Sequence, residues 1–332
     1  MRNPLLIPIL LILPCVSMLA QQSPIYSQYV LNEFIINPSV AGIDGMTTVN
    51  FSGRKQWLGR EYTPSTYTAS VSTRLLKTSN AVLNRMYGPN LYKKGASGRV
   101  GIGASLLEDR NGAINRTGLN LTYSYHIFIL NSQLSFGLSF LAQQFKIDRE
   151  LAQFAVDPGG SIDPTEGLIG KSAYIPDAAF GLNFSNNSYS LGFSAFQLFQ
   201  SPVKFGDIEA DFKQLKQVRQ YTVLCSYNNT LNGKPEWEYE PAVIVRATER
   251  FQPVADISIR FIYKREYWTG LSLRTSGDFI LLTGLRINRM YFGYSFDYGF
   301  NEISRQTFGS HEITMAVKFG DSTRRYRYWE RY

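Results

Sequence analysis

The side chains that most often carry catalysis or bind metals are scarce in this chain of 332 residues. It has two histidines, His126 and His311, and beyond the first 20 residues a single cysteine, Cys225. A Ser-His-Asp triad needs a histidine that a carboxylate orients toward a nucleophile, and neither histidine has a suitable nucleophile nearby in sequence. One thiol can form neither an internal disulfide nor a thiolate zinc site. We therefore expect no catalytic residues, no metal site and no enzymatic activity.

Two further patterns resemble binding motifs without completing them. The segment 157–166, DPGGSIDPTE, groups acidic residues with Gly and Pro, and oxygen-rich loops can bind calcium. Its spacing is not that of an EF-hand, so we interpret it as a solvated outer loop. Gly101 and Gly103 match the start of a dinucleotide-binding motif, but no helix is expected after them. Both glycines are predicted to face the interior of a barrel, and no cofactor is expected.

The elements that would hold any site are strands with a period of two residues. In the segment 118–129, apolar residues such as Leu121 and Tyr123 alternate with small or polar ones such as Thr122 and Ser124. The same alternation recurs at 134–140, 256–264 and 292–300. Because successive side chains of a strand point to opposite faces, each segment has one apolar and one polar face.

The polar face of these segments indicates what each side of the sheet meets. It consists mainly of Gly, Ser, Asn and Thr, with a few charges of both signs: Asp256, Arg260, Arg274, Arg286, Asp297 and Lys318. A soluble sandwich, the alternative, would bury its apolar face and present Lys, Glu and Thr to bulk water. Small side chains with a few charges of opposite sign are instead typical of a confined barrel lumen. Tyr263, Tyr298 and Phe300 lie at the ends of the apolar faces, as expected of the aromatic girdles at the two membrane interfaces. The sequence predicts an all-β outer-membrane barrel whose apolar face meets lipid.

Composition and charge agree with this interpretation. Apolar residues make up 44% of the chain, aromatic residues 14% and charged residues 18%, whereas soluble domains average roughly 25% charged. The net charge is +8, which suits a surface near anionic lipid headgroups. Nucleic-acid binding requires a clustered basic stripe, and here Lys and Arg are scattered through the strand-like segments. No nucleic-acid partner is expected.

The chain is predicted to have four regions. A secretory signal peptide is expected at 1–20, because Arg2 precedes a short apolar run at 5–13 and Ala20 closes a plausible cleavage region. The other regions are an N-terminal segment at 21–45, periplasmic or plugging the barrel, a transmembrane barrel at 46–319, and a basic aromatic periplasmic tail at 320–332.

About 14 antiparallel strands are expected, an even number that membrane barrels permit. They begin near Thr47, Thr66, Gly98, Thr117, Gln133, Ala178, Ser188, Gln220, Tyr239, Val254, Tyr267, Phe279, Tyr291 and His311. The ninth is the least regular because Pro241 interrupts it. Short connections, near 131, 186, 228–235, 265 and 288, alternate with long ones at 148–173, 200–217 and 300–310. There are two exceptions, a short outer connection at 276–278 and a long inner one at 77–97. Because successive connections lie at opposite ends of a barrel, most of the long ones fall at one end and both termini at the other. The pattern predicts long loops outside the cell and both termini in the periplasm.

Four motifs stand in order around the first predicted strand. They are Tyr26-Ser27-Gln28-Tyr29, Asn37-Pro38 with Ala41-Gly42, Arg54 with Gln56-Trp57, and Pro64 with Thr66, and GSHE at 309–312 precedes the last strand. Together they closely resemble the PorP/SprF family of the type IX secretion and gliding machinery of Bacteroidetes, and the resemblance spans essentially the whole mature chain. Ser23 departs from the family pattern, which has Asp before Pro24.

The resemblance implies an outer-membrane barrel without enzymatic activity. Such a barrel would support the export or surface anchoring of proteins that carry a type IX C-terminal signal domain, particularly large adhesins. The resemblance also implies a periplasmic peptidoglycan-associated partner, and it brings no residue-level role with it. The alternative is a channel for small hydrophobic molecules, similar to the long-chain fatty-acid channels, with an apolar pocket beneath the N-terminal segment.

The motif residues are candidates for a plug or a partner-binding surface. Asn-Pro and Ala-Gly are turn elements, so the N-terminal segment is expected to fold back toward the barrel, anchored by its aromatic residues. Arg54 and Gln56 share a phase and are expected to point inward near the outer rim, with Trp57 at the interface. The candidate set is Tyr26, Ser27, Gln28, Tyr29, Asn37, Pro38, Gly42, Arg54, Gln56 and Trp57. The alternative is that these residues only seal and stabilise the barrel.

Overall fold

The computed structural model describes residues 25–75, 99–148, 172–202, 217–249, 252–300 and 306–320. Nearly all of its regular structure is β-strand, apart from the short helix α1 (Glu33–Ile36) and one turn of 3-10 helix, η1 (Pro38–Val40). Within these ranges, no helix is long and apolar enough to cross a membrane.

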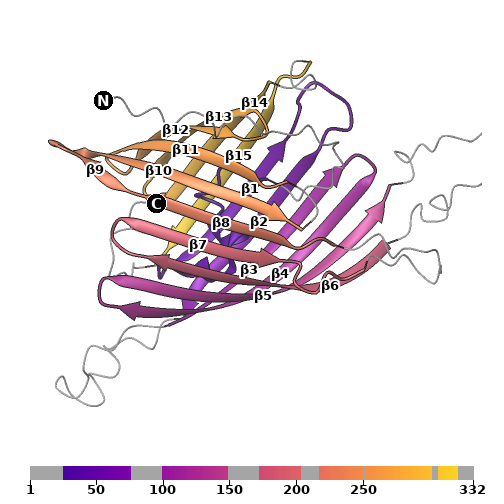
Figure 1. Ribbon diagram of the computed structural model, residues 1–332, viewed down its shortest axis with the longest axis horizontal. Helices are drawn as coiled ribbons and strands as arrows, with labels where there is room; N and C mark the ends of the chain where they lie inside the picture. The colour runs from indigo at the N-terminus through magenta and orange to yellow at the C-terminus, as the bar shows by residue number, and fades with distance from the viewer. Residues whose placement is uncertain are drawn as a thin grey trace, which may run out of the picture.

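The strands form one antiparallel sheet that closes on itself (Figure 1). They are β1 (Thr47–Lys55), β2 (Ser65–Leu75), β3 (Val100–Asn111), β4 (Ile114–Ile129), β5 (Ser132–Ile147), β6 (Ser172–Ser185), β7 (Tyr189–Phe196), β8 (Gln220–Tyr227), β9 (Asn229–Leu231), β10 (Lys234–Thr248), β11 (Val254–Tyr263), β12 (Tyr267–Arg274), β13 (Asp278–Ile287), β14 (Met290–Gly299) and β15 (Ser310–Phe319). β15 pairs with β1 and closes the wall. The short β9 pairs with β10 and continues the line of β8, so the wall is a closed barrel of 14 strands, as predicted.

Two predicted strand starts were wrong, and a proline explains part of each error. β6 begins at Ser172 and not near Ala178. Pro176, inside β6, pairs with Ala142 of β5, while pairing with β7 extends only as far as Phe180. The missing N–H of this proline therefore faces no neighbouring strand, and the strand tolerates it.

The other error concerns β10, which begins at Lys234 and not near Tyr239. The partner of β10 on one side changes along its length, because β9 pairs with it up to Tyr239 and β8 pairs with it from Ala242 onward. Pro241 lies at this change of partner, where no ladder hydrogen bond is required of it on that side. The predicted interruption is therefore a local irregularity within one continuous strand.

Polar side chains line the interior of the barrel and apolar side chains cover its outside. In β4, Ser124 and His126 are fully buried, whereas Leu121 and Tyr123 are 50% and 52% exposed. The same inversion holds in β5, where Ser135 is buried and Leu138 is 59% exposed. An apolar outer band around a polar interior is the arrangement of a membrane barrel, so the orientation predicted from the alternation is confirmed.

The connections alternate between the two ends of the barrel as expected. Short turns join β4 to β5, β11 to β12 and β13 to β14, and they adopt left-handed backbone at Leu130, Lys264, Arg265 and Asn288. These turns lie where β1 begins and β15 ends, which we name the turn end. The connections after β1, β5 and β7 lie at the opposite end, which we name the loop end. Which end faces the outside of the cell stays a prediction.

Candidate functional site

Residues 25–46, named here the plug segment, lie inside the barrel. Contacts reach well-separated parts of the wall: the Tyr29 hydroxyl hydrogen-bonds to Ser258 of β11 at 2.6 Å, and Ser194 of β7 donates to the Ile36 carbonyl at 2.7 Å. On β4, Ser124 donates to the Ala41 carbonyl at 2.7 Å. Since hydrogen bonds extend from the segment to strands on different sides, it occupies the lumen across its width.

The plug segment also runs along the length of the lumen. At the loop end, Ser27 contacts Arg54, the penultimate residue of β1, at 2.8 Å. At the turn end, Asp44 forms an ion pair with Lys318 of β15 at 3.2 Å. The beginning of the described chain therefore lies at the loop end, because strand parity fixes only where β1 begins and not the path of the residues before it. Both termini themselves lie outside the described residues, and their periplasmic position stays a prediction.

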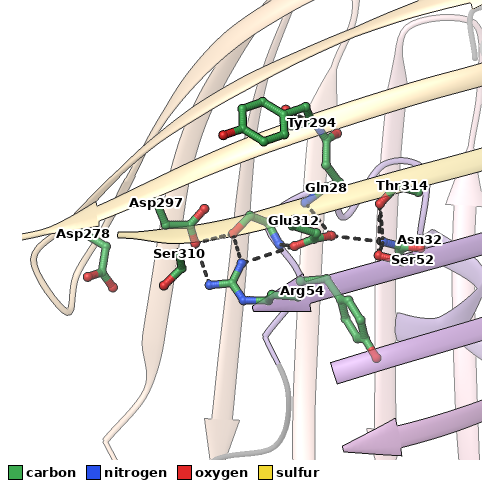
Figure 2. Close-up of polar contacts among 12 residues, drawn as sticks. Gln28, Asn32, Ser52, Arg54, Asp278, Tyr294, Asp297, Ser310, Glu312 and Thr314 are labelled. Atoms are coloured by element: carbon green, nitrogen blue, oxygen red, sulfur yellow. Dashed lines mark hydrogen bonds and ion pairs between the residues drawn. The ribbon is translucent and has the colours of Figure 1, made fainter. Parts of the chain in front are cut away.

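A buried ionic cluster fixes the loop end of the plug segment (Figure 2). Arg54 forms ion pairs with Asp297 of β14 at 2.7 Å and with Glu312 of β15 at 3.2 Å. Ser27 completes the group, because its N–H donates to Glu312 at 2.7 Å and its hydroxyl donates to Asp297 at 2.6 Å. We name these four residues, with Gln28 and Asn32, the Arg54 cluster.

Gln28 and Asn32 extend the Arg54 cluster into the lumen. Asn32 donates to the Glu312 carboxylate at 3.2 Å, and the Gln28 N–H donates to it at 3.3 Å. The Gln28 side-chain amide also donates to the backbone carbonyls of Thr283 and Tyr294. A fully buried carboxylate is stable only when it is well paired and hydrogen-bonded, and for Glu312 most of the donors come from the plug segment.

A second group of charges holds the first described residues of the plug segment. Asp256 of β11 accepts from Arg246 at 2.9 Å and from Arg274 at 2.8 Å. Arg246 in turn donates to the backbone carbonyl of Tyr26 at 3.2 Å. Arg274 also lies 3.6 Å from Asp297, so this group adjoins the Arg54 cluster. Charges on four strands thus converge on the plug segment at the loop end.

At the turn end, close backbone approach acts together with the Asp44–Lys318 ion pair. The fully buried Ala41 offers its carbonyl to Ser124 at 2.7 Å and to His126 at 3.0 Å. Gly101 of β3 lies against the same carbonyl, and a Cβ at Gly101 would overlap the Ala41 oxygen. Gly42 has φ +64°, and a Cβ there would come within 2.6 Å of the Thr73 carbonyl oxygen. Glycine is therefore required at both positions.

Both histidines hydrogen-bond to neighbouring groups of the protein. His126 is fully buried in the lumen, where it hydrogen-bonds to Ser135 at 2.8 Å as well as to Ala41. His311, near the loop end of β15, contacts the hydroxyl of Tyr294 at 2.7 Å. Across the described residues, no group of three or more His, Cys, Asp or Glu side chains is arranged to hold a metal ion. The segment 157–166 lies outside the described residues.

Only some of the candidate residues come together. Ser27, Gln28 and Arg54 share the Arg54 cluster, whereas Asn37 lies farther along the lumen and donates to the Leu182 carbonyl at 3.0 Å. Trp57 follows β1 in the loop-end connection, where its N–H donates to Ser310 at 3.3 Å. The remaining candidates lie beside these positions: Tyr26, Tyr29 and Pro38, buried in the plug segment, Gly42 at its turn end, and the half-buried Gln56 next to Trp57.

The candidate set omitted Asn32, Asp297 and Glu312, which complete the Arg54 cluster. A signal for two of them was available in the sequence. Asp297 is one of the few charges on the polar phase of a strand, and Glu312 ends the GSHE motif. Asn32 gave no such signal. A charge that faces a barrel lumen needs a partner, so such charges are sound candidates for contacts with a plug.

Glu33 is an acidic side chain of the plug segment whose acidity changes inside the barrel. It belongs to α1 and not to a membrane-spanning strand, and it is half-buried. The pKa of its carboxyl is raised to about 8, chiefly by desolvation and also by the neighbouring negative charge of Glu240, while the positive charges of Lys318 and Arg260 oppose the shift. The neutral acid is therefore favoured when the plug segment is in place.

Comparison with known proteins identifies the family. The family model described as type IX secretion system membrane protein PorP/SprF matches residues 18–317. No curated protein matched the sequence.

Solved structures with a similar fold are outer-membrane barrels. Omp33 of Acinetobacter baumannii is 9% identical, with coverage of 83% of this chain and 100% of its own and a TM-score of 0.44. The CymD monoaromatic hydrocarbon channel is 10% identical, with coverages of 88% and 94% and a TM-score of 0.49. The Pseudomonas putida toluene transporter TodX is 10% identical, with coverages of 89% and 94% and a TM-score of 0.45. With a family match over nearly the whole barrel, the chain belongs to the PorP/SprF family of type IX secretion membrane proteins and resides in the outer membrane.

Proposed function

We propose that this barrel binds exported proteins at its loop end and supports their export or anchoring at the cell surface. The observation that carries the proposal is the plug segment, which hydrogen-bonds to β1, β4, β7, β11 and β15 within the lumen. A lumen filled in this way leaves the two ends of the barrel as the surfaces available to a protein partner. Family membership in the secretion machinery supports the same role.

The size of the cavities around the plug segment favours protein binding over transport of small molecules. The cavity lined by Val30, Leu31 and Trp268 measures about 10 Å³, and a second, lined in part by Tyr26 and Ile36, measures about 80 Å³. Sites for small ligands typically span roughly 300–1,000 Å³. A channel for hydrophobic molecules would need a larger apolar pocket beneath the plug segment, or displacement of the segment itself.

The partners that this function implies differ between the ends of the barrel. At the loop end, the partner is a secreted protein with a type IX C-terminal signal domain, such as an adhesin. At the turn end, the partner is a periplasmic protein associated with peptidoglycan. Outer-membrane lipid surrounds the apolar band between the two ends.

Deletion of the gene, followed by an inventory of surface-bound and released proteins, tests the proposal. We expect one adhesin or a small set of exported proteins to disappear from the surface, and the wild-type gene to restore them. An affinity-tagged wild-type barrel should co-purify the same proteins. An unchanged inventory combined with defective uptake of small hydrophobic molecules would contradict the proposal and favour the channel.

A further inference from the structure

A hollow lies in the outer face of the barrel wall, near the turn end. Its volume is about 630 Å³, within the roughly 300–1,000 Å³ that is typical of sites for small ligands. Most of the residues that line it are aromatic or aliphatic, among them Trp237, Phe261, Tyr267 and Tyr294. These four side chains are exposed on the outside of the barrel, so the hollow opens toward lipid. We name it the outer groove.

The register of four neighbouring strands explains the outer groove. Thr269 of β12 lies directly opposite Thr283 of β13. In the same row, Phe261 of β11 lies opposite Thr269, and Tyr294 of β14 lies opposite Thr283. Side chains in directly opposite positions share one face of the sheet. Two small side chains between two large aromatic ones therefore form a floor with a wall on either side.

The polar groups of the outer groove are already hydrogen-bonded within the protein. The hydroxyls of Thr269 and Thr283 donate to backbone carbonyls on each other's strands, at 3.3 Å and 3.4 Å. The Tyr294 hydroxyl hydrogen-bonds to His311 at 2.7 Å. The floor therefore needs no polar partner from a ligand, and it offers methyl groups and aromatic rings. A hydrocarbon chain matches this surface.

Positive charge borders the outer groove at the turn end. Residues 264–266 and 286–289, in and beside the two adjoining turns, include four basic side chains and one acidic side chain. The Nζ of Lys264 lies 5.2 Å from the centre of the Tyr263 ring, which lines the groove. Glu236 lies 3.9 Å from Lys264, but both side chains are at least half exposed, so solvent screens this pair. An anionic group at this end of the groove would be attracted.

The width of the outer groove suits a hydrocarbon chain better than a helix of a protein partner. Phe261 and Tyr294 lie on β11 and β14, which are three strand spacings apart, or roughly 14 Å. The two aromatic side chains take up part of that width. A helix with its side chains is about 10–12 Å across, whereas an acyl chain is much thinner and can lie along the floor.

We propose that the outer groove binds one anionic glycerophospholipid, with an acyl chain over Thr269 and Thr283 and its phosphate near Lys264. This inference goes beyond the proposed function and does not depend on it, because the groove lies on the lipid side of the wall. With the turn end in the periplasm, as predicted, the lipid belongs to the inner leaflet. The rings of Trp237 and Tyr263 lie 4.8 Å apart and occupy the headgroup level, as in the aromatic girdles of membrane barrels.

A titration of the full-length barrel with phosphatidylglycerol, followed by native mass spectrometry, tests the inference. We expect one tightly bound lipid in the wild type. Thr283→Trp fills the groove from the outside and should lower the affinity about tenfold, which corresponds to lost apolar contact for about two methylene groups. Val71→Trp is the matched control, because Val71 is 41% exposed on the outer face of β2, outside the groove. Its affinity should equal that of the wild type.

Lys264→Gln tests the contact with the phosphate. The wild type should bind phosphatidylglycerol about fivefold more tightly than zwitterionic phosphatidylethanolamine, since one cation near a membrane surface attracts an anionic lipid to about this extent. Lys264→Gln should remove the preference and leave the affinity for phosphatidylethanolamine unchanged. Equal affinities of the wild type for the two lipids would show that the ligand is not an anionic lipid.

Other outcomes would overturn the inference as a whole. Wild-type affinity in Thr283→Trp, or equal losses in Thr283→Trp and Val71→Trp, would show that the bound lipid is only part of the general lipid shell. A protein that co-purifies with the wild type and Val71→Trp, but not with Thr283→Trp, would replace the lipid with a protein partner. Heat-modifiable migration in detergent gels shows that each variant is folded, and Thr269→Trp repeats the test if Thr283→Trp is not.

Discussion

The two ends of the plug segment are held by different physical means. Around Ser27, charged side chains from β1, β14 and β15 meet in the buried Arg54 cluster. Around Ala41, the contacts are neutral hydrogen bonds and a glycine that permits close approach. A buried ion pair is little affected by small shifts in position but is strongly destabilised when one partner is removed. Close packing against a glycine is little affected by the loss of one hydrogen bond but is destabilised by added side-chain volume. The turn end also has the Asp44–Lys318 ion pair, but only at the loop end does one arginine pair with two buried carboxylates, so we expect a charge change at Arg54 to weaken the attachment most.

The largest effect is expected when cysteine labelling on intact cells tests which end of the barrel faces outward, because each position should be either labelled or unlabelled. Tyr62, in the β1–β2 connection at the loop end, is 68% exposed, and Leu130, in a turn at the turn end, is 93% exposed. In a Cys225→Ser background, a membrane-impermeant maleimide added to intact cells should label Tyr62→Cys and leave Leu130→Cys unlabelled. Lysed cells provide the control, because both variants should react there. The reverse pattern would place the Arg54 cluster on the periplasmic side.

The next largest effect is expected at the Arg54 cluster. Arg54→Ala leaves the buried Glu312 without a cation and Asp297 with only Arg274, at 3.6 Å; breaking a buried pair in this way typically costs about 3–5 kcal/mol. Arg110→Ala is the matched control, because Arg110 pairs with Glu108 on the surface with its side chain 60% exposed, and such pairs contribute about 0–1 kcal/mol. Denaturant unfolding in detergent micelles measures both. Equal destabilisation of the two variants would show that the Arg54 cluster does not hold the plug segment.

A smaller effect is expected where the plug segment packs against Gly101. Gly101→Ala forces the Ala41 carbonyl away from β3, and overpacking of this kind costs about 1–3 kcal/mol. Gly118→Ala, also in the wall, is the control, because a Cβ there would meet its nearest neighbour at 3.6 Å, an ordinary contact. Limited proteolysis of the N-terminal segment should accelerate in Gly101→Ala only. If the control variant is cleaved equally fast, the close approach at Ala41 is not what protects the segment.

The smallest effect is a dependence on pH that arises from Glu33. Its pKa is raised from 4.5 to about 8 when the plug segment is in place, so the folded state holds the proton more tightly than the unfolded state. The stabilisation is fully present below pH 4.5 and is lost as the pH rises toward 8. Because Glu33 is half-buried, solvent reduces this to at most about 1 kcal/mol. Glu33→Gln should reduce the difference in melting temperature between pH 5 and pH 8. If this difference is as large as in the wild type, a group other than Glu33 causes it.

The barrel wall could be predicted from the sequence more completely than the contacts of the plug segment. The barrel wall was predictable because strand alternation is local, and most strand starts lie within a few residues of the prediction. The starts of β6 and β10 were not, because Pro176 and Pro241 are tolerated only where a neighbouring strand is missing or changes, which depends on pairing elsewhere. The Arg54 cluster combines residues near both ends of the chain. All of its members except Asn32 were visible in the sequence as lumen charges or motif residues, but only the closed barrel brings them together.

Conductance in planar lipid bilayers tests most directly the claim that the plug segment closes the lumen. The wild-type barrel should insert without producing steps in current, because the plug segment bonds to the wall from the loop end to the turn end. A variant lacking residues 26–40 should produce stable, uniform steps. Wild-type channels with the same conductance as the deletion variant would contradict the account, since the segment would then not occupy the lumen in the membrane.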